Sequence, residues 1–285
     1  MMHTRRRFIR IVPALGAFAV PALAPRFTSA AAFEQAAAPD GPAWPSPEPA
    51  RGTPVDESFP SQHIALAKEI VGVSHGNLAR VRELVQQHPA LAKASFDWGY
   101  GDWETALGAA AHTGRREIAE LLIENGAPPT LFSAVMLGQL DLVKAFLAVM
   151  PGGQRMRGPH SISLLTHARL GGPPAASVLK YLETLGDADL PLKDEPLTEE
   201  DRAQLDGRYT FGDRPRDNFT VTTTPQGPAI ERVGAPFSRG ILHVGDLAFY
   251  PVGAHQVRIR FEREGAKIVA LAIHDPDLVV RARKL

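Results

Sequence analysis

TALGAAAHTGRREIAELLIENGA, residues Thr105–Ala127, is the stretch that decides the fold. Apolar residues recur three and four positions apart in both of its halves, which predicts two short amphipathic helices. The inward-facing positions are Leu107, Ala110, Ala111, Ile118, Leu121 and Leu122. Gly114 lies between the two halves and is expected to turn the chain. The stretch therefore predicts a helix–turn–helix unit.

This unit resembles an ankyrin repeat, whose usual pattern runs TPLHxAAxxGHxEIVxLLLxxGA. Ala106 and Gly108 stand where the family has Pro and His, so two side chains of the usual capping network are missing. The resemblance implies a helical solenoid that binds a protein partner. It implies no reaction, since a fold does not specify an activity.

Neighbouring segments repeat the pattern less closely, and they can be aligned on their turn glycines. The glycines expected at the repeat turns are Gly76, Gly114, Gly138 and Gly172. We predict about four degenerate repeats within residues 61–189, enough to close a solenoid core. The first repeat departs most, because Glu69 stands where Leu is expected.

The segment FDWGYGDWE, Phe96–Glu104, precedes the best repeat, at the place where ankyrin repeats project a finger loop. Its aromatic residues are Phe96, Trp98, Tyr100 and Trp103. Aromatic rings bury a large area at little entropic cost, so this group is a candidate site for a protein partner. The alternative is that Trp98 or Trp103 folds back and shields the first repeat.

The N-terminus resembles a bacterial twin-arginine export signal. Arg5, Arg6 and Phe8 lie in TRRRFIR, and the apolar run that follows is too short to span a bilayer. We expect a signal peptide at residues 1–32, cleaved near Ala30–Ala32, and a periplasmic or secreted protein with no stable membrane span. A basic N-terminus without an export role is the alternative.

The charge and composition of the sequence restrict the class of partner and the chemistry that the chain can perform. Five of the 31 basic residues precede the first acidic residue, so a processed chain would have 26 basic and 31 acidic residues, a net charge of −5. This balance disfavours nucleic acid as a partner. Cysteine is absent, which excludes disulfides and thiolate chemistry. Residues 33–60 are rich in Ala and Pro and are expected to form a linker.

Beyond a charged linker at residues 190–200, the apolar period changes from that of a helix to that of a strand. Val257, Ile259 and Phe261 alternate with charged residues, and Gly265 lies in a predicted hairpin turn. Around eight short strands are expected within residues 201–285. This number suggests a small antiparallel β-barrel after the α-helical solenoid.

The strand-rich part also resembles the lipocalin-like β-domain that is appended to many bacterial serine hydrolases. The resemblance is carried by LDGRY, by ILHVGDLAFYPV and by VRIRFEREGAKIVALAI. No hydrolase domain precedes it within this sequence. The resemblance therefore implies a β-domain without the catalytic half of the family.

One catalytic pattern occurs in the sequence. Ser177 and Lys180 form SxxK, the nucleophile pattern of penicillin-recognising enzymes, but they lie in a predicted repeat helix and the companion motifs do not occur. Coincidence is the favoured explanation.

Histidines were considered as metal ligands in two groups. His243, His255 and His274, with Asp275 and Asp277, could converge on the barrel, but their spacing resembles no ligand pair. The histidines near helix turns, His75, His112 and His167, are assigned to capping or surface roles. We therefore predict no catalytic residue, no metal and no cofactor.

The leading hypothesis is a non-enzymatic exported ankyrin-repeat protein that binds an unidentified protein partner. The second is that the barrel binds a small apolar molecule, such as a lipid or a cell-wall fragment, because its alternating strands allow either a filled core or a cavity. A cryptic hydrolase is the third.

Overall fold

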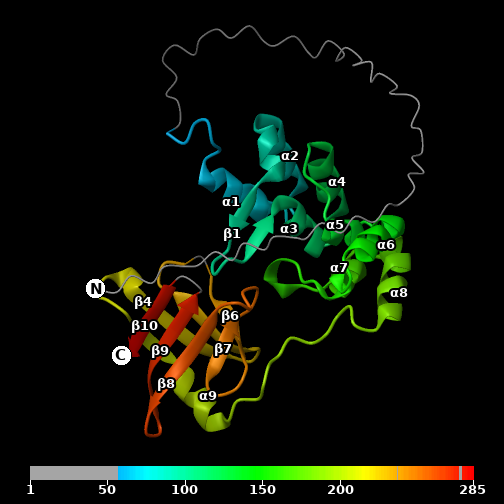
Figure 1. Ribbon diagram of the computed structural model, residues 1–285. Helices are drawn as coiled ribbons and strands as arrows, with labels where there is room; N and C mark the ends of the chain where they lie inside the picture. The colour runs from blue at the N-terminus through cyan, green and yellow to red at the C-terminus, as the bar shows by residue number, and fades with distance from the viewer. Residues whose placement is uncertain (1–56, 236, 276–277) are drawn as a thin grey trace, which may run out of the picture. The chain divides into compact units, whose positions relative to one another are not determined.

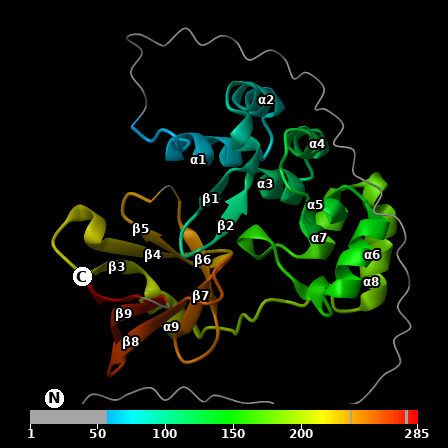
Figure 2. The same ribbon diagram turned by 45° about the horizontal axis from the view of Figure 1, so that its top comes forward.

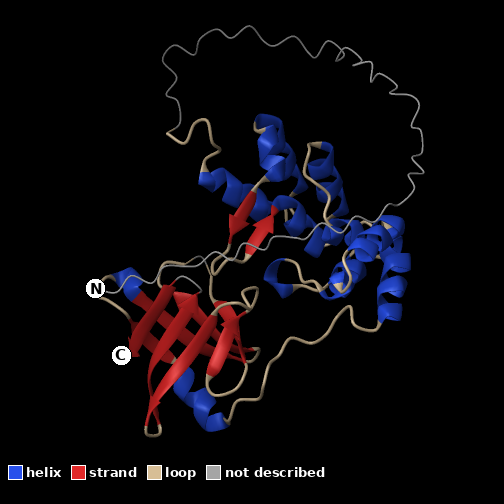
Figure 3. Cartoon of the chain, in the orientation of Figure 1, coloured by secondary structure: helices blue, strands red, loops and turns tan. Residues whose placement is uncertain are grey.

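A computed structural model describes residues 57–285 apart from 236 and 276–277. All of them belong to one compact unit, Val55–Leu285. The residues predicted as an export signal, its cleavage site at Ala30–Ala32 and most of the predicted linker at 33–60 lie outside the described residues. Helices dominate the first part of the described chain and strands the second (Figure 3).

The helical region consists of four successive helix pairs (Figure 1). They are α1 (Ile64–Val73), α2 (Leu78–Gln87), α3 (Ala106–His112), α4 (Arg116–Glu124), α5 (Leu131–Met136), α6 (Leu140–Val149), α7 (Leu164–Leu170) and α8 (Ala176–Leu185). The first helices α1, α3, α5 and α7 form one row in which each contacts the next. Such stacking buries the apolar face of each pair against its neighbours, as in a repeat solenoid.

Residues Thr105–Ala127 form the α3–α4 pair. The Thr105 hydroxyl accepts a hydrogen bond from the Gly108 backbone N–H at 2.9 Å, so α3 is capped without the family's Pro and His. The inward positions predicted from the spacing are buried, except Leu121, which is half-buried. The buried ones are Leu107, Ala110, Ala111, Ile118 and Leu122.

The predicted turn glycines differ in backbone conformation. Gly114, Gly138 and Gly172 have positive φ angles of 68°, 76° and 66°, whereas Gly76 lies in the α1–α2 turn without one. A Cβ at Gly138 would lie 2.1 Å from the carbonyl oxygen of Pro174, and a Cβ at Gly114 would lie 2.4 Å from a carbonyl oxygen in α7. These two turns therefore pack directly against the backbone of a later repeat.

Two apolar clusters fill the helical region. One lies among α1 to α4 and includes Ile70, Leu84 and Leu122, and the other lies among α5 to α8 and includes Leu164 and Leu182. Glu69, which stands where Leu is expected in a repeat, instead accepts a hydrogen bond from Arg80 at 2.7 Å. The charged pair explains why the first repeat departs from the apolar pattern.

A two-stranded hairpin precedes α3. It consists of β1 (Ser95–Asp97) and β2 (Trp103–Thr105), which pair antiparallel with Ser95 opposite Thr105. β1 packs against α1 and β2 leads directly into α3 (Figure 2). The loop between the strands is the predicted finger loop.

The C-terminal part is a closed antiparallel barrel of eight strands in the order β10-β3-β4-β5-β6-β7-β8-β9. The strands are β3 (Gly207–Thr210), β4 (Asn218–Thr224), β5 (Gly227–Arg232), β6 (Arg239–His243), β7 (Ala248–Pro251), β8 (Arg258–Glu264), β9 (Lys267–Asp275) and β10 (Leu278–Lys284). The predicted fold class, a helical solenoid followed by a small antiparallel barrel, is confirmed.

Large side chains fill the centre of the barrel. Tyr209, Phe249 and Ile259 are fully buried there, and the Tyr209 hydroxyl donates to the Leu205 carbonyl oxygen at 2.7 Å. Leu205 ends α9 (Glu199–Leu205) and belongs to the same core. Since α9 leads into the first residue of β3, it closes the barrel at the end where β3 begins.

The described helices are each ten residues long or shorter. Among them, none combines the length and the apolar character that crossing a membrane requires.

Candidate functional site

The four finger-loop aromatics are distributed between two environments. Trp103 in β2 is 62% exposed, whereas Phe96, Trp98 and Tyr100 are partly buried. Tyr100 has a positive φ of 60° and lies between two glycines that also have positive φ, Gly99 and Gly101. This run of left-handed residues makes the tight loop, and it separates Trp103 from the other three rings.

Phe96, Trp98 and Tyr100 line a pocket of about 640 Å³ together with residues of the barrel. The barrel contributes three rings and four aliphatic side chains, namely Phe211, Phe219, Phe237, Ile230, Ile273, Leu278 and Val280. Phe219, Ile230 and Ile273 also belong to the barrel core, so they form the floor of the pocket. A mostly apolar concavity of this volume is typical of a small-molecule site.

The strand order explains why these residues meet. In an antiparallel barrel the end of one strand and the start of the next lie at the same rim. Phe211 follows β3 and Phe219 is near the start of β4, while Ile273 is near the end of β9 and Val280 near the start of β10. The pocket therefore lies at the rim opposite α9, the mouth of the barrel.

The three cationic side chains among the described residues of the pocket lie on aromatic rings. The Lys68 ammonium is 5.6 Å from the centre of the Phe96 ring. The Arg232 guanidinium is 5.4 Å from the ring centre of Phe211, and a third cation, Arg239, stacks on Phe237. The faces of the rings attract these cations, so their positive charges are stabilised beside an apolar cavity.

Arg239 also joins the barrel to the hairpin loop. Its guanidinium donates to the Trp98 carbonyl oxygen at 2.9 Å and forms an ion pair with Asp102. Both side chains of the pair are at least nine-tenths buried. Gln256 of the barrel donates to the Tyr100 carbonyl oxygen at 3.1 Å, so several direct contacts hold the loop at the barrel mouth.

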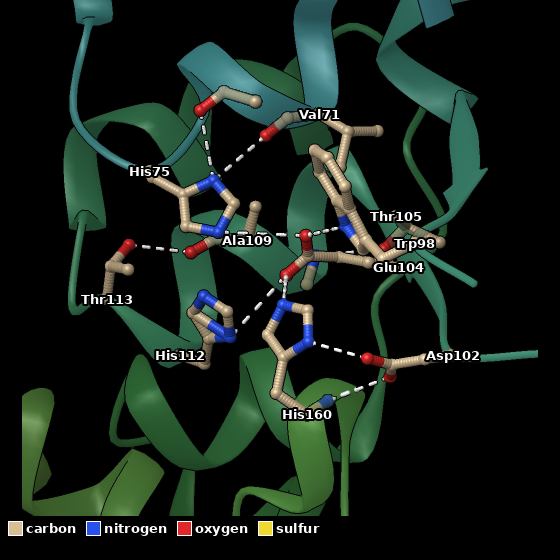
Figure 4. Close-up of polar contacts among 12 residues, drawn as sticks. Val71, His75, Trp98, Asp102, Glu104, Thr105, Ala109, His112, Thr113 and His160 are labelled. Atoms are coloured by element: carbon tan, nitrogen blue, oxygen red, sulfur yellow. Dashed lines mark hydrogen bonds and ion pairs between the residues drawn. The ribbon is translucent and has the colours of Figure 1, made fainter. Parts of the chain in front are cut away.

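A polar cluster lies within the helical region, next to Trp98, which lines the pocket (Figure 4). It consists of His75 from the α1–α2 turn, Glu104 from β2, His112 from the end of α3 and His160 from a 3-10 helix, Pro159–Ser161. One potential ligand atom from each residue lies within 4.8 Å of all the others. These are the residues that could hold a metal ion.

Glu104 is the centre of the cluster. Its two carboxylate oxygens lie 3.6 Å from His75 Nε2, 3.5 Å from His112 Nδ1 and 3.5 Å from His160 Nε2. The side chain is fully buried, and its Oε2 accepts a hydrogen bond from the Trp98 indole N–H at 2.7 Å. Trp98 therefore connects the pocket wall to the cluster.

The pKa values of the cluster follow from burial and from these contacts. Burial lowers the pKa of His112 to about 4 against the pull of Glu104. Burial acts on His160 in the same direction, but hydrogen bonds with Asp102 and Glu104 outweigh it and raise its pKa to about 9. Burial of Asp102 is likewise outweighed by hydrogen bonds from His160 and Arg239, which lower its pKa to about 2.

Other residues considered from the sequence lie apart from these features. Ser177 and Lys180 are exposed on α8 and do not line the pocket. His243 is buried and its Nδ1 contacts the Glu195 carbonyl oxygen, whereas His255 is exposed. Asp277 lies outside the described residues.

Sequence reasoning missed the histidine cluster. A surface role is wrong for His112 and for His167, because both side chains are buried. His160 and Glu104 were not considered at all as ligands, since the four residues are separated by unequal intervals that match no metal motif. The sequence offered one indication, the acidic residue Glu104 within an aromatic segment, and a single acidic residue does not indicate which histidines lie near it.

Comparison with known proteins supports one part of the chain. The sequence model of the ankyrin repeat family matches residues 102–133, which contain the stretch Thr105–Ala127. No curated protein and no solved structure matches the chain. The helical region thus carries an ankyrin repeat, a unit that generally mediates protein interactions, and a closed eight-stranded barrel follows it.

Proposed function

We propose that this chain binds a small, largely apolar molecule at the mouth of the barrel. The observation that supports the proposal is the pocket of about 640 Å³, lined by the finger-loop rings and by the barrel floor. Six aromatic rings surround it, so a planar apolar ligand would gain stacking as well as burial. Lys68 and Arg232 at the rim are balanced by Asp97 and Asp275, and Arg239 is paired with Asp102, so the described lining has no excess charge and the rings dominate recognition.

Neighbouring residues of β10 provide the test. Val280 lines the pocket, whereas Val279 points to the other face of the strand and is 61% exposed. A Val280→Trp side chain would occupy the pocket, and Val279→Trp adds the same ring outside it. The probe is anilinonaphthalene sulfonate, an apolar dye with one anionic group, titrated into the full chain and followed by fluorescence.

We expect saturable binding of one dye to the wild type and to Val279→Trp, and at least a tenfold weaker affinity for Val280→Trp. Equal dye affinity for the two variants, or no saturable binding by the wild type, would refute the proposal. Fatty acids and muropeptides then compete with the dye, which distinguishes a lipid from a cell-wall fragment.

A protein partner is the second candidate function, favoured by Trp103. Its ring is 62% exposed on the hairpin, and large exposed aromatics are enriched among the residues that dominate protein binding. We propose that the protein acts in the periplasm or outside the cell, on the strength of the twin-arginine resemblance of residues 4–10. Capture of envelope proteins by the wild type and by Trp103→Ala tests this, and equal recovery of the same partner would contradict a role for Trp103.

An enzymatic activity has less support. Ser177 and Lys180 lie on α8 and are not among the residues that line the pocket, and the described part of the lining includes no Ser, Thr, Cys or His. We therefore propose a binding protein rather than a hydrolase.

A further inference from the structure

We propose that His75, Glu104, His112 and His160 bind one zinc ion in the helical region. The residues are three imidazoles and one carboxylate, a donor set that suits Zn²⁺ in tetrahedral coordination. Ligand atoms around a tetrahedral zinc lie roughly 3.3 Å apart, given bond lengths of about 2.0 to 2.1 Å. Glu104 Oε1 lies 3.5 Å from His112 Nδ1 and from His160 Nε2, close to that separation, and Glu104 Oε2 lies 3.6 Å from His75 Nε2. The four ligand atoms lie within 4.8 Å of one another, so a bound zinc would draw the side chains inward.

Two buried atoms of the cluster make no hydrogen bond of good geometry, although they lie 3.5 Å from each other. They are Glu104 Oε1 and His112 Nδ1, on side chains that are 0% and 5% exposed. A buried polar atom without a partner is costly, so native proteins rarely retain one without a reason. Both atoms point into the space that the four residues enclose (Figure 4), where a cation would satisfy them together.

The remaining ring nitrogens of two histidines are already engaged. His75 Nδ1 lies 3.0 Å from the Gly72 carbonyl oxygen, and His160 Nδ1 lies 2.7 Å from Asp102 Oδ2. Both partners are acceptors, so each Nδ1 carries a proton. His75 Nε2 faces the cluster, and zinc would displace the proton that His160 Nε2 directs at Glu104. Metal-binding histidines are generally oriented by such hydrogen bonds to carbonyls and carboxylates.

An ion can reach the site from one side, and the four side chains would complete its coordination. His75 and His160 are 34% and 30% exposed, so an ion can enter from their side, while Glu104 and His112 form the buried floor. Four protein ligands fill a tetrahedron and leave no open position, which is typical of a structural zinc site. The ion would tie the first repeat, the hairpin and the segment before α7 to one another.

The test measures metal binding by the full chain, purified on an affinity tag without histidines and stripped by a chelator. Co²⁺ serves as the spectroscopic probe, since a tetrahedral site gives intense visible bands, and zinc then displaces it in a competition titration. The variants are His75→Ala, on a partly exposed side chain, and Glu104→Gln, which keeps the shape of the carboxylate. His255→Ala, an exposed histidine of the barrel, is the matched control.

We expect one Co²⁺ per chain with tetrahedral bands for the wild type and for His255→Ala. Loss of a direct ligand should weaken zinc affinity by more than the 10- to 100-fold that is typical for loss of an outer partner. The proposal is wrong if the wild type takes up no metal, if the bands are octahedral, or if His75→Ala and Glu104→Gln both bind zinc like the control. Circular dichroism verifies that each variant is folded, and the dye titration at the barrel mouth is read separately.

Discussion

Replacing Gly138 by alanine would place a methyl group against the backbone of a later repeat. The turn has a φ of 76°, and the added Cβ would lie 2.1 Å from the Pro174 carbonyl oxygen. A left-handed conformation costs a non-glycine residue about 1 to 2 kcal/mol, and overpacking adds about 1 to 3 kcal/mol. The contact is with backbone, so no side-chain rotation relieves it, and the expected loss is about 2 to 5 kcal/mol.

Gly186 is the matched control. Its φ is 77° at the end of α8, but a Cβ there meets nothing within 4 Å. Gly186→Ala should therefore cost only the backbone part, about 1 to 2 kcal/mol. Equilibrium unfolding in urea, followed by the helical circular dichroism signal, measures both losses. Equal destabilisation by the two substitutions would refute the view that repeat packing selects the turn glycine.

Two further predictions concern the contacts around the pocket. Trp98→Phe should weaken zinc affinity by about 10- to 100-fold in a competition titration, because Glu104 loses the hydrogen bond from the indole. Dye affinity should stay within about threefold of the wild type, because an aromatic ring still lines the pocket. Arg239→Met should destabilise the fold by up to about 3 kcal/mol in urea unfolding, because the buried Asp102 then keeps only His160 as a charged partner and the Trp98 carbonyl oxygen loses its guanidinium donor. A matched substitution in the exposed pair of Arg281 with Glu262 should have a much smaller effect, and equal effects would contradict the importance of burial.

The pocket also shows why the aromatic segment was difficult to assign from sequence. Its composition identified Phe96, Trp98, Tyr100 and Trp103 as a group, and the two open alternatives were an exposed site and a shield for the first repeat. The structure divides the group, because Trp103 is exposed while the other three rings line the pocket. Phe96 and Trp98 also pack against the core of α1 to α4, as the second alternative expected for Trp98. The surface that receives them comes from strands more than a hundred residues later, and no local pattern relates those strands to the loop.

The cap of α3 shows a related limit. The loss of the family's Pro and His at Ala106 and Gly108 indicated an incomplete network, yet Thr105 caps the helix through its own hydroxyl. One hydrogen bond within three residues is a local event, and it forms whether or not the wider network exists. The His112 side chain at the end of α3 points to Glu104 in β2, and the ankyrin sequence pattern does not predict this contact.

The sequence by itself determined the secondary-structure elements of this protein, namely the helix pairs around Thr105–Ala127 and the eight strands after residue 200. It also showed where the apolar period changes from that of a helix to that of a strand. Those features depend on periodicity within a few residues, so they are visible along the chain. Only the tertiary structure brought His75, Glu104, His112 and His160 together and placed three aromatic rings over the barrel mouth. These contacts join residues far apart in the sequence, and they depend on how the repeats stack and how the barrel closes. No fixed spacing along the sequence therefore predicts them.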